Sequence, residues 1–267
     1  MTVRIVEGRS GSFLLSLNGG DAEVVRDALD AGVVRLQSLE AECLPDFDLI
    51  ETGSIDVLPR SAVMRRAMEV LRQGVVQTGI EYDASYVPPV LLGALADDVL
   101  ATMLDGRHFD SAYVVSGESG AFQIDMEGVL DVPSKTRGAL WLEMIHGLRP
   151  GMVRGGIAFA GPRFGNFGNA LTSGADIVSL HGATAAETAL SALLVAGAAQ
   201  LDASARTASV PPVEAVWDAL SAGVRLLSVL RNHRFVRSGV LTLRGRGRSV
   251  GPIRVDRLVR FGVSDWR

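Results

Sequence analysis

Cysteine and lysine are almost absent from this sequence of 267 residues. Cys43 is the only cysteine, which excludes a disulfide framework within the chain and a metal site built on cysteines. Lys135 is the only lysine, so nearly all of the positive charge comes from arginine. We interpret the missing lysines as the composition of a GC-rich genome. The alternative is that Lys135 contacts a phosphate or a carboxylate.

Aromatic residues are scarce as well, at 6% of the chain, although 48% of the residues are hydrophobic. This composition predicts a core of valine, leucine and alanine, and it disfavours a nucleic-acid surface built on stacked aromatic rings. The formal net charge is −4. We therefore expect no general affinity for nucleic acid or for anionic lipid.

Long apolar segments free of charge are missing too. The best candidate, residues 87–104, carries Asp97 and Asp98, which argues against a transmembrane helix. Residues 1–10 lack the apolar core of a signal peptide. From these two observations we expect a soluble cytoplasmic protein that does not enter a membrane.

Apolar periodicity predicts that helices and strands share the chain. Helices are expected at residues 22–43, 61–73, 90–104, 185–199 and 213–230. Strands are expected at residues 3–6, 13–17, 112–115, 122–126, 128–132, 138–145, 153–159, 177–180, 236–243 and 253–261. Asp21 is expected to cap the first helix, and Gly74 to end the second.

A polar linker at residues 202–209, followed by two prolines, marks a boundary in the chain. It divides the sequence into a domain at residues 1–205 and a C-terminal unit at residues 206–267. That unit is predicted to contain a helix and a β-hairpin around the turn 244–251, packed on the same domain.

Seven glycines fall between Gly151 and Gly174. Glycine at this density predicts backbone with unusual φ values, or backbone that approaches a ligand closely, between two strands of the core. Arg163 and Asn166 lie among these glycines, and an arginine on such a loop can bind a phosphate through two hydrogen bonds. The alternative is an exposed loop charge.

Glu187 and Ser191 are four residues apart, so they share one face of the helix predicted at 185–199. A carboxylate in a first turn is favoured by the helix dipole, and free N–H groups there can hold a phosphate. A carboxylate and a hydroxyl at this spacing are also suitable ligands for Mg²⁺. The alternative is that Glu187 stabilises the helix while Ser191 packs as a small residue.

His181 follows the strand predicted at 177–180 and lies near Glu187 in the sequence. It is a candidate catalytic residue, with a buried or capping histidine as the alternative. His108 and His146 have no cysteine or histidine partner at metal-binding spacing, so zinc is not expected.

Residues 186–197, AETALSALLVAG, resemble the C-terminal helix motif of the ApbE family of FAD:protein FMN transferases, roughly ADALSTALFVLG. In this resemblance Glu187 falls on the family's metal-binding aspartate and Ser191 on its metal-binding threonine. Residues 156–161, GIAFAG, resemble the family's GIATSG-like strand and turn, with Phe159 and Ala160 replacing its two hydroxyl-bearing residues.

The uncharacterised UPF0280 group, an ApbE-like branch, is similar over more of the chain. Residues 87–97, VPPVLLGALAD, resemble its GPMAAVAGALAE helix, and residues 114–121, VVSGESGA, resemble its VENGGD strand and turn. Glu118 is the carboxylate nearest to the acid of that turn. The resemblance implies an ApbE-like α/β (α+β) fold, with mixed or antiparallel sheets and helices packed on them.

The resemblance further implies a site where the glycine-rich turns meet the helix 185–199. The strict version is an FMN transferase in which Glu187 and Ser191 hold Mg²⁺ on the pyrophosphate of FAD. The departures at Phe159 and Ala160 favour a diverged enzyme acting on a flavin, a nucleotide or a related small anionic molecule. The alternative is a non-catalytic ligand-binding or assembly protein, and in either case a homo-oligomer is expected. The expected ligand-binding residues are Gly156, Gly161, Arg163, Asn166, Thr172, Ser173, Ser116, Gly117 and Glu118.

Overall fold

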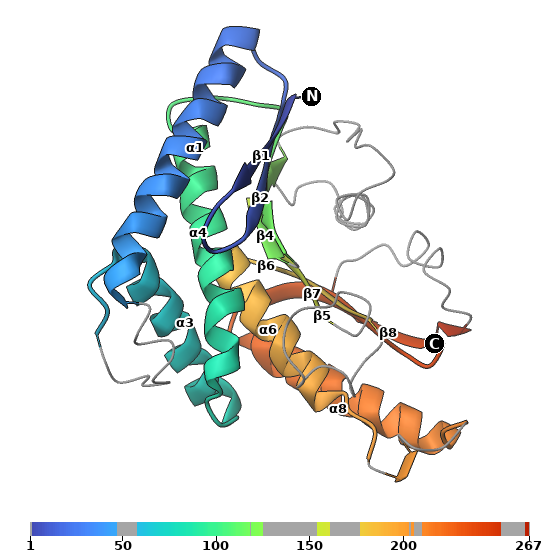
Figure 1. Cartoon of the computed structure of the whole chain (residues 1–267). Helices are drawn as coiled ribbons and strands as arrows, with labels where there is room; N and C mark the ends of the chain where they lie inside the picture. The colour runs from blue at the N-terminus through green and yellow to red at the C-terminus, as the bar shows by residue number, and fades with distance from the viewer. Residues whose placement is uncertain are drawn as a thin grey trace.

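The computed structural model describes residues 2–46, 58–117, 119–124, 154–160, 177–202, 204–205, 210–251 and 265–266. Within these residues the chain forms one nine-stranded sheet and the helices that pack against it (Figure 1). The strands are β1 (Thr2–Glu7), β2 (Ser12–Asn18), β3 (Ser111–Ser116), β4 (Ser119–Ile124), β5 (Arg154–Ala160), β6 (Ile177–Gly182), β7 (Val236–Leu243), β8 (Arg246–Val250) and β9 (Asp265–Trp266). The helices are α1 (Ala22–Cys43), α3 (Ala62–Thr78), α4 (Val87–Leu104), α6 (Ala185–Ala198) and α8 (Val213–Asn232), with short 3-10 turns η1 (Leu44–Asp46) and η2 (Ala84–Tyr86).

The strands lie side by side in the order in which they occur in the sequence. Every neighbouring pair from β1 to β8 is antiparallel, and β9 adds to β8 in parallel. Helices α1, α3 and α4 are inserted between β2 and β3, whereas α6 and α8 are inserted between β6 and β7. The expected α/β class, an antiparallel sheet with helices packed on it, is therefore confirmed.

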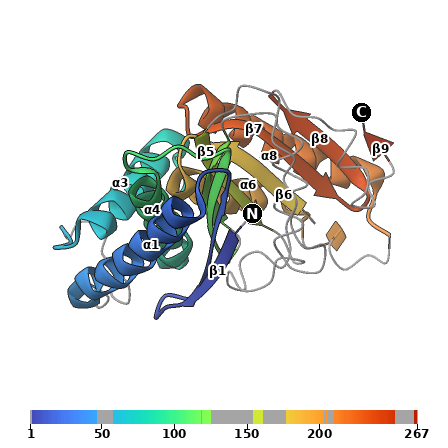
Figure 2. The same cartoon turned by 90° about the horizontal axis from the view of Figure 1, so that it is seen from above.

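The described helices lie on one face of the sheet, as Figures 1 and 2 show. Strand alternation accounts for this, because directly paired residues such as Leu15 and Val114, or Ala158 and Leu180, are apolar and face the helices. Helices α1, α4, α6 and α8 contact the strands, and α3 packs on α4 and α6. The main core thus lies between the sheet and this single helical layer.

Helix boundaries follow local sequence signals. The Asp21 side chain accepts a hydrogen bond from the Glu23 backbone N–H at 2.9 Å, as predicted for the cap of α1. The prediction that Gly74 ends the next helix is wrong. Gly74 lies inside α3, where a Cβ would overlap the Leu190 side chain, and the helix ends at Gly79, whose φ is +65°.

Two predicted loops turn out to be tight hairpins. β3 and β4 are joined by two residues only, the first being Gly117 with φ of +56°. β7 and β8 are joined by Arg244 and Gly245, both with positive φ, as a two-residue hairpin turn requires. Residues 246–250 therefore form a strand rather than a turn. The strands predicted at 128–132 and 138–145, and most of 253–261, lie outside the described residues.

In the part of the chain that the structure describes, one segment, Ala84–Leu104, is long and apolar enough to cross a membrane. Of its most apolar window, 67% is buried inside the protein. The segment contains α4, which packs against α1, α3, α6 and the strands β3 and β4. Burial of this kind indicates the core helix of a soluble protein.

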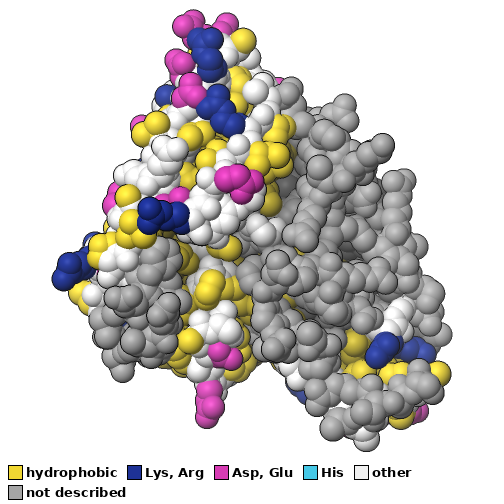
Figure 3. Space-filling view, viewed as in Figure 1, with side chains coloured by type: hydrophobic (Ala, Val, Ile, Leu, Met, Phe, Trp, Pro, Cys, Tyr) yellow, Lys and Arg dark blue, Asp and Glu magenta, His cyan; other side chains and the backbone are white. Residues whose placement is uncertain are grey.

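The C-terminal unit continues the same sheet. β7 pairs with β6, and α8 packs on α6 and β7. On the face shown in Figure 3, positive and negative side chains are interspersed along α1, where Arg4 pairs with Asp30 and Arg26 with Glu23. The described part of this face shows no large area of a single charge.

Candidate functional site

The start of α6 is held between α4 and β5 by two glycines. A Cβ on Gly93 would lie 2.7 Å from the Ala185 carbonyl oxygen, and a Cβ on Gly156 would overlap the Thr184 carbonyl. Both positions therefore need glycine so that backbone can approach backbone. Gly156, a predicted ligand-binding residue, is explained by this contact with α6.

The first backbone N–H groups of α6 are already occupied. The Asp97 carboxylate on α4 accepts hydrogen bonds from Ala185 N at 2.9 Å and from Ala186 N at 3.2 Å. Thr184 Oγ1 accepts from Glu187 N at 3.1 Å, and the Thr184 carbonyl accepts from Thr188 N. The expectation that free N–H groups at this helix start hold a phosphate is therefore wrong, because the protein supplies its own anion there.

Glu187 and Ser191 share a helix face, as predicted, but each side chain has an internal role. Thr184 Oγ1 donates to Glu187 Oε2 at 3.0 Å, which together with the bond from Glu187 N resembles a capping box. Burial raises the pKa of Glu187, and the bonds with Thr184 partly offset that effect.

The Ser191 side chain is fully buried, and its hydroxyl donates to the Glu187 carbonyl at 2.7 Å. Among the described residues, no group of three or more histidine, cysteine, aspartate or glutamate side chains could hold a metal ion. Because Ser191 Oγ is enclosed and bonded to backbone, these two residues do not fit a Mg²⁺ site in this arrangement. The metal role remains a prediction without support from their contacts.

A cleft of about 280 Å³ opens beside the start of α6. Two arginines from different elements share it, Arg66 of α3 and Arg154 of β5. Arg66 Nη2 lies 3.2 Å from Asp98 Oδ2, whereas the Arg154 guanidinium forms no ion pair with any described residue. The lining residues are Arg66, Asp97, Leu100, Ala101, Arg154, Gly155, Ala183 and Thr184.

The position of Arg66 is fixed by a small charge network. Asp98 accepts from Arg35 Nε at 2.8 Å through its other oxygen, so it links α1 with α3. The hydrogen bond to Asp98 raises the pKa of Arg35. Arg66 is therefore largely neutralised within the protein, and Arg154 is the cation that remains available to a molecule in the cleft.

Asp97 is the carboxyl group that lines this cleft. Burial raises its pKa from 3.8 to about 6, although the hydrogen bonds from Ala185 N and Ala186 N and the charge of Arg66 act in the opposite direction. Part of the side chain is still reached by solvent, in agreement with its place in the cleft wall. A carboxyl group with a pKa this close to neutral is a candidate general acid or base.

His181 does not lie beside Glu187. Its place in β6, directly opposite Ile157, puts the imidazole on the sheet face away from the helices, at 1% exposure. Burial and then the charge of Arg237 lower its pKa to about 4, so the ring is neutral at pH 7. A Cβ on Gly155 would lie 2.9 Å from His181 Nε2, so the ring sits behind the cleft wall at Gly155.

That far face carries several buried polar groups. Neither nitrogen of His181 has a hydrogen-bond partner among the described residues, and the same holds for the hydroxyl of Ser238, which is directly opposite on β7. The ring of Phe122 lies 5.5 Å from the imidazole. The other unpartnered hydroxyls on this face, within the described ranges, belong to Ser16, Ser111 and Tyr113.

In its described part, the predicted loop around residue 117 is a tight hairpin turn whose residues have structural roles. Ser116 ends β3, is buried, and donates from Oγ to the Ser12 carbonyl at 3.2 Å. Gly117 adopts the positive φ that the two-residue hairpin turn requires. The other predicted ligand-binding residues, Glu118, Gly161, Arg163, Asn166, Thr172 and Ser173, lie outside the described residues.

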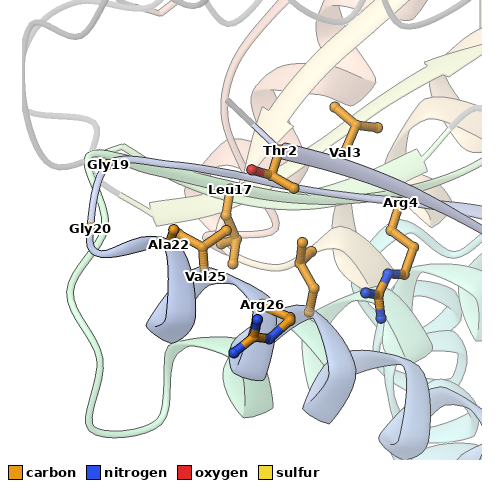
Figure 4. Close-up of a pocket in the computed structure, with 10 residues that line it drawn as sticks. Thr2, Val3, Arg4, Leu17, Gly19, Gly20, Ala22, Val25 and Arg26 are labelled. Atoms are coloured by element: carbon orange, nitrogen blue, oxygen red, sulfur yellow. The ribbon is translucent and has the colours of Figure 1, made fainter.

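A second hollow of about 350 Å³ lies between β1 and α1 (Figure 4). Its floor is apolar, with Leu17 from β2 and Val25 from α1. Arg4 and Arg26 on its rim are paired with Asp30 and, at 3.6 Å, Glu23. It shares no residue with the α6 cleft, and its charges are balanced, so the α6 cleft is the better candidate site.

The most informative residues of the site were not singled out as site residues from the sequence. Arg66 is not among the site residues predicted from the sequence, and Asp97 enters there only as a charge that interrupts an apolar run. A signal for the role of Glu187 does exist, since Thr184 and Glu187 have the spacing of a capping box.

No protein-family model matches this chain, and no curated protein is significantly similar to it.

Proposed function

We propose that the protein is a diverged ApbE-like enzyme that acts on a small anionic molecule, such as a flavin, a nucleotide or a related compound, in the cleft beside α6. One observation carries this proposal: Arg66 and Arg154 line the same cleft as the partly buried carboxyl group of Asp97, whose pKa is about 6. Guanidinium groups bind carboxylates and phosphates, and the carboxyl group of Asp97 supplies or removes a proton near neutral pH.

The size of the cleft bears on the substrate. A volume of about 280 Å³ lies just below the range for sites that enclose a drug-sized ligand. The described part of the site therefore accommodates the anionic end of a flavin nucleotide rather than the whole of FAD. FAD, FMN and Mg²⁺ remain the cofactors of the strict transferase. We derive no step through the metal, because Glu187 and Ser191 are engaged elsewhere.

The test is to measure, by equilibrium titration, the binding of four anions: FAD, FMN, pyrophosphate and sulfate. The Arg154→Gln substitution removes the arginine of the cleft that has no ion pair with a described residue. It should abolish binding of the anions. Arg231→Gln, an exposed arginine in the last turn of α8, is the matched control and should leave it unchanged. Equal affinity of the two variants, or the absence of any binding to the unmodified protein, would overturn the proposal.

A non-catalytic ligand-binding protein is the second candidate, because both oxygens of Asp97 already cap a helix. The two candidates differ in the fate of the ligand. An enzyme converts a bound flavin or nucleotide into a product detectable by chromatography and mass spectrometry. A binding protein releases the same compound unchanged.

We also propose a cytoplasmic homo-oligomer. Val3 and Ile5 point to one face of β1 and are 41% and 65% exposed, so two neighbouring apolar side chains lie at the surface of this edge strand. Among the described strands β1 pairs only with β2, and we propose that a second chain pairs with its other edge. Sedimentation velocity should show a multimer that Ile5→Lys dissociates; a monomer at all concentrations would contradict this.

A further inference from the structure

We propose that the α6 cleft takes up an oxyanion, a carboxylate or a phosphate group, together with one proton, and that Asp97 receives the proton. The inference rests on the proposed function, since it concerns the same cleft. It explains how the cleft can hold a negatively charged ligand beside the carboxyl group of Asp97.

The charges around the cleft show why an anion needs a proton. Arg66 is paired with Asp98, which leaves Arg154 as the cation of the cleft without a carboxylate partner among the described residues. Against it stand the carboxylates of Asp97, in the cleft wall, and Glu187, which acts on Asp97 from α6. While Asp97 is ionised, an oxyanion entering the cleft would therefore meet the negative charge of its carboxylate, with Arg66 already paired with Asp98. Protonation of Asp97 removes the nearer repulsion.

Asp97 is built to accept this proton without losing its structural role. Each carboxylate oxygen accepts one backbone N–H, from Ala185 or Ala186, and each has a second lone pair. A proton can occupy one of these free positions while the helix amides stay bonded. The resulting O–H group then donates to the oxyanion, a charge-assisted hydrogen bond that the ionised carboxylate cannot form.

The other titratable groups near the cleft do not replace Asp97. His181 lies behind Gly155 with a pKa lowered to about 4, so it takes up no proton near neutral pH. Glu187 is occupied by Thr184 and does not line the cleft.

The coupling between anion binding and protonation of Asp97 has a definite sign and size. Above the pKa of Asp97 in the free protein, about 6, binding must be accompanied by proton uptake. The affinity for the anion should then fall up to about tenfold for each unit of rising pH. Below that pKa the carboxyl group is already protonated and the affinity should level off. By reciprocity, a bound anion raises the pKa of Asp97.

The experiment is calorimetric titration with sulfate, whose charge is constant in this range. Near pH 7, titrations in two buffers of different ionisation enthalpy count the protons taken up per bound anion. We expect close to one proton for the unmodified protein. Asp97→Asn should bind sulfate with no proton uptake and no pH dependence above pH 6. Asp105→Asn, an exposed aspartate just beyond α4, should behave like the unmodified protein.

The outcomes separate the two proposals. Sulfate binding without proton uptake by the unmodified protein, or an unchanged pH slope in Asp97→Asn, would overturn the proton coupling and leave the proposed function standing. Absence of sulfate, FMN and pyrophosphate binding at every pH would overturn both. The proton count of the unmodified protein decides the question even if Asp97→Asn does not fold.

Discussion

The raised pKa of Asp97 predicts an unusual dependence of the protein's stability on pH. Its pKa in the folded protein is about 6, above the ordinary value of 3.8. A raised folded-state pKa contributes stability that is fully present below the unfolded pKa and is lost as the pH rises through the folded one. The protein should therefore lose stability between about pH 4 and pH 6 because of this one group.

The size of this loss of stability follows from the shift in the pKa of Asp97. The difference between 3.8 and about 6 corresponds to about 3 kcal/mol at full value. Solvent reaches part of the Asp97 side chain through the cleft, and this screening reduces the effect. We expect a loss of between about 1 and 3 kcal/mol in the free energy of unfolding.

Urea unfolding of the natural protein and of Asp97→Asn, at matched pH values, isolates this contribution. Asparagine has the same shape and does not titrate, so all other groups cancel in the difference between the two free energies. The variant retains one acceptor but turns an NH₂ group toward a second backbone N–H, which adds a penalty that does not depend on pH. The difference between the two proteins should thus decrease steadily toward pH 6.

The opposite slope would refute the reasoning. A carboxylate that caps a helix ordinarily has a lowered pKa, because the helix dipole and the N–H donors stabilise its charge. If stability relative to Asp97→Asn rose between pH 4 and pH 6, those effects would outweigh burial. Asp97 would then be a permanently charged structural cap, unsuited to proton transfer near neutral pH.

Three further substitutions test the packing around α6 and β6. Gly156→Ala should lower the free energy of unfolding by about 2 to 4 kcal/mol in the same urea experiment, because the new Cβ would overlap the backbone of Thr184. Gly197→Ala is the control, since a Cβ there meets open space, and it should be neutral or slightly stabilising. Thr184→Ala should cost about 1 kcal/mol by circular-dichroism melting, and Thr184→Ser should restore most of it; equal melting temperatures would exclude a cap. Ser238→Ala should leave stability unchanged or raise it, since its buried hydroxyl has no partner among the described residues; a clear loss would reveal one elsewhere.

The fold could largely be predicted from local signals. The helix at 22–43 was found from apolar spacing and from Asp21, and the structure has the same bounds. The errors occurred where tertiary contacts outweigh local preference. Gly74 resembles a helix end in the sequence, but α3 continues through it because Leu190 of α6 fills the space beside it. The tight hairpin at Arg244 was missed because an arginine, rather than asparagine or glycine, adopts the first positive φ.

The site was harder to predict because its parts come from distant segments. Asp97 and Ala185 are 88 positions apart, and no local pattern shows that a carboxylate on one helix meets the start of another. The position of His181 illustrates the same difficulty. Proximity to Glu187 in sequence suggested proximity in space, but strand alternation in β6 turns the ring to the other face of the sheet.

The physical reasoning about α6 was nevertheless correct in kind. The start of this helix attracts negative charge, and Asp97 satisfies that demand from within the protein. A ligand in the cleft consequently cannot rely on helix amides, which are bonded already. Its affinity must come from guanidinium groups, of which Arg154 lacks an ion-pair partner in the described structure. Anion binding should therefore weaken steeply with salt, because Arg154 is exposed, and independence from ionic strength would point to a site elsewhere in the chain.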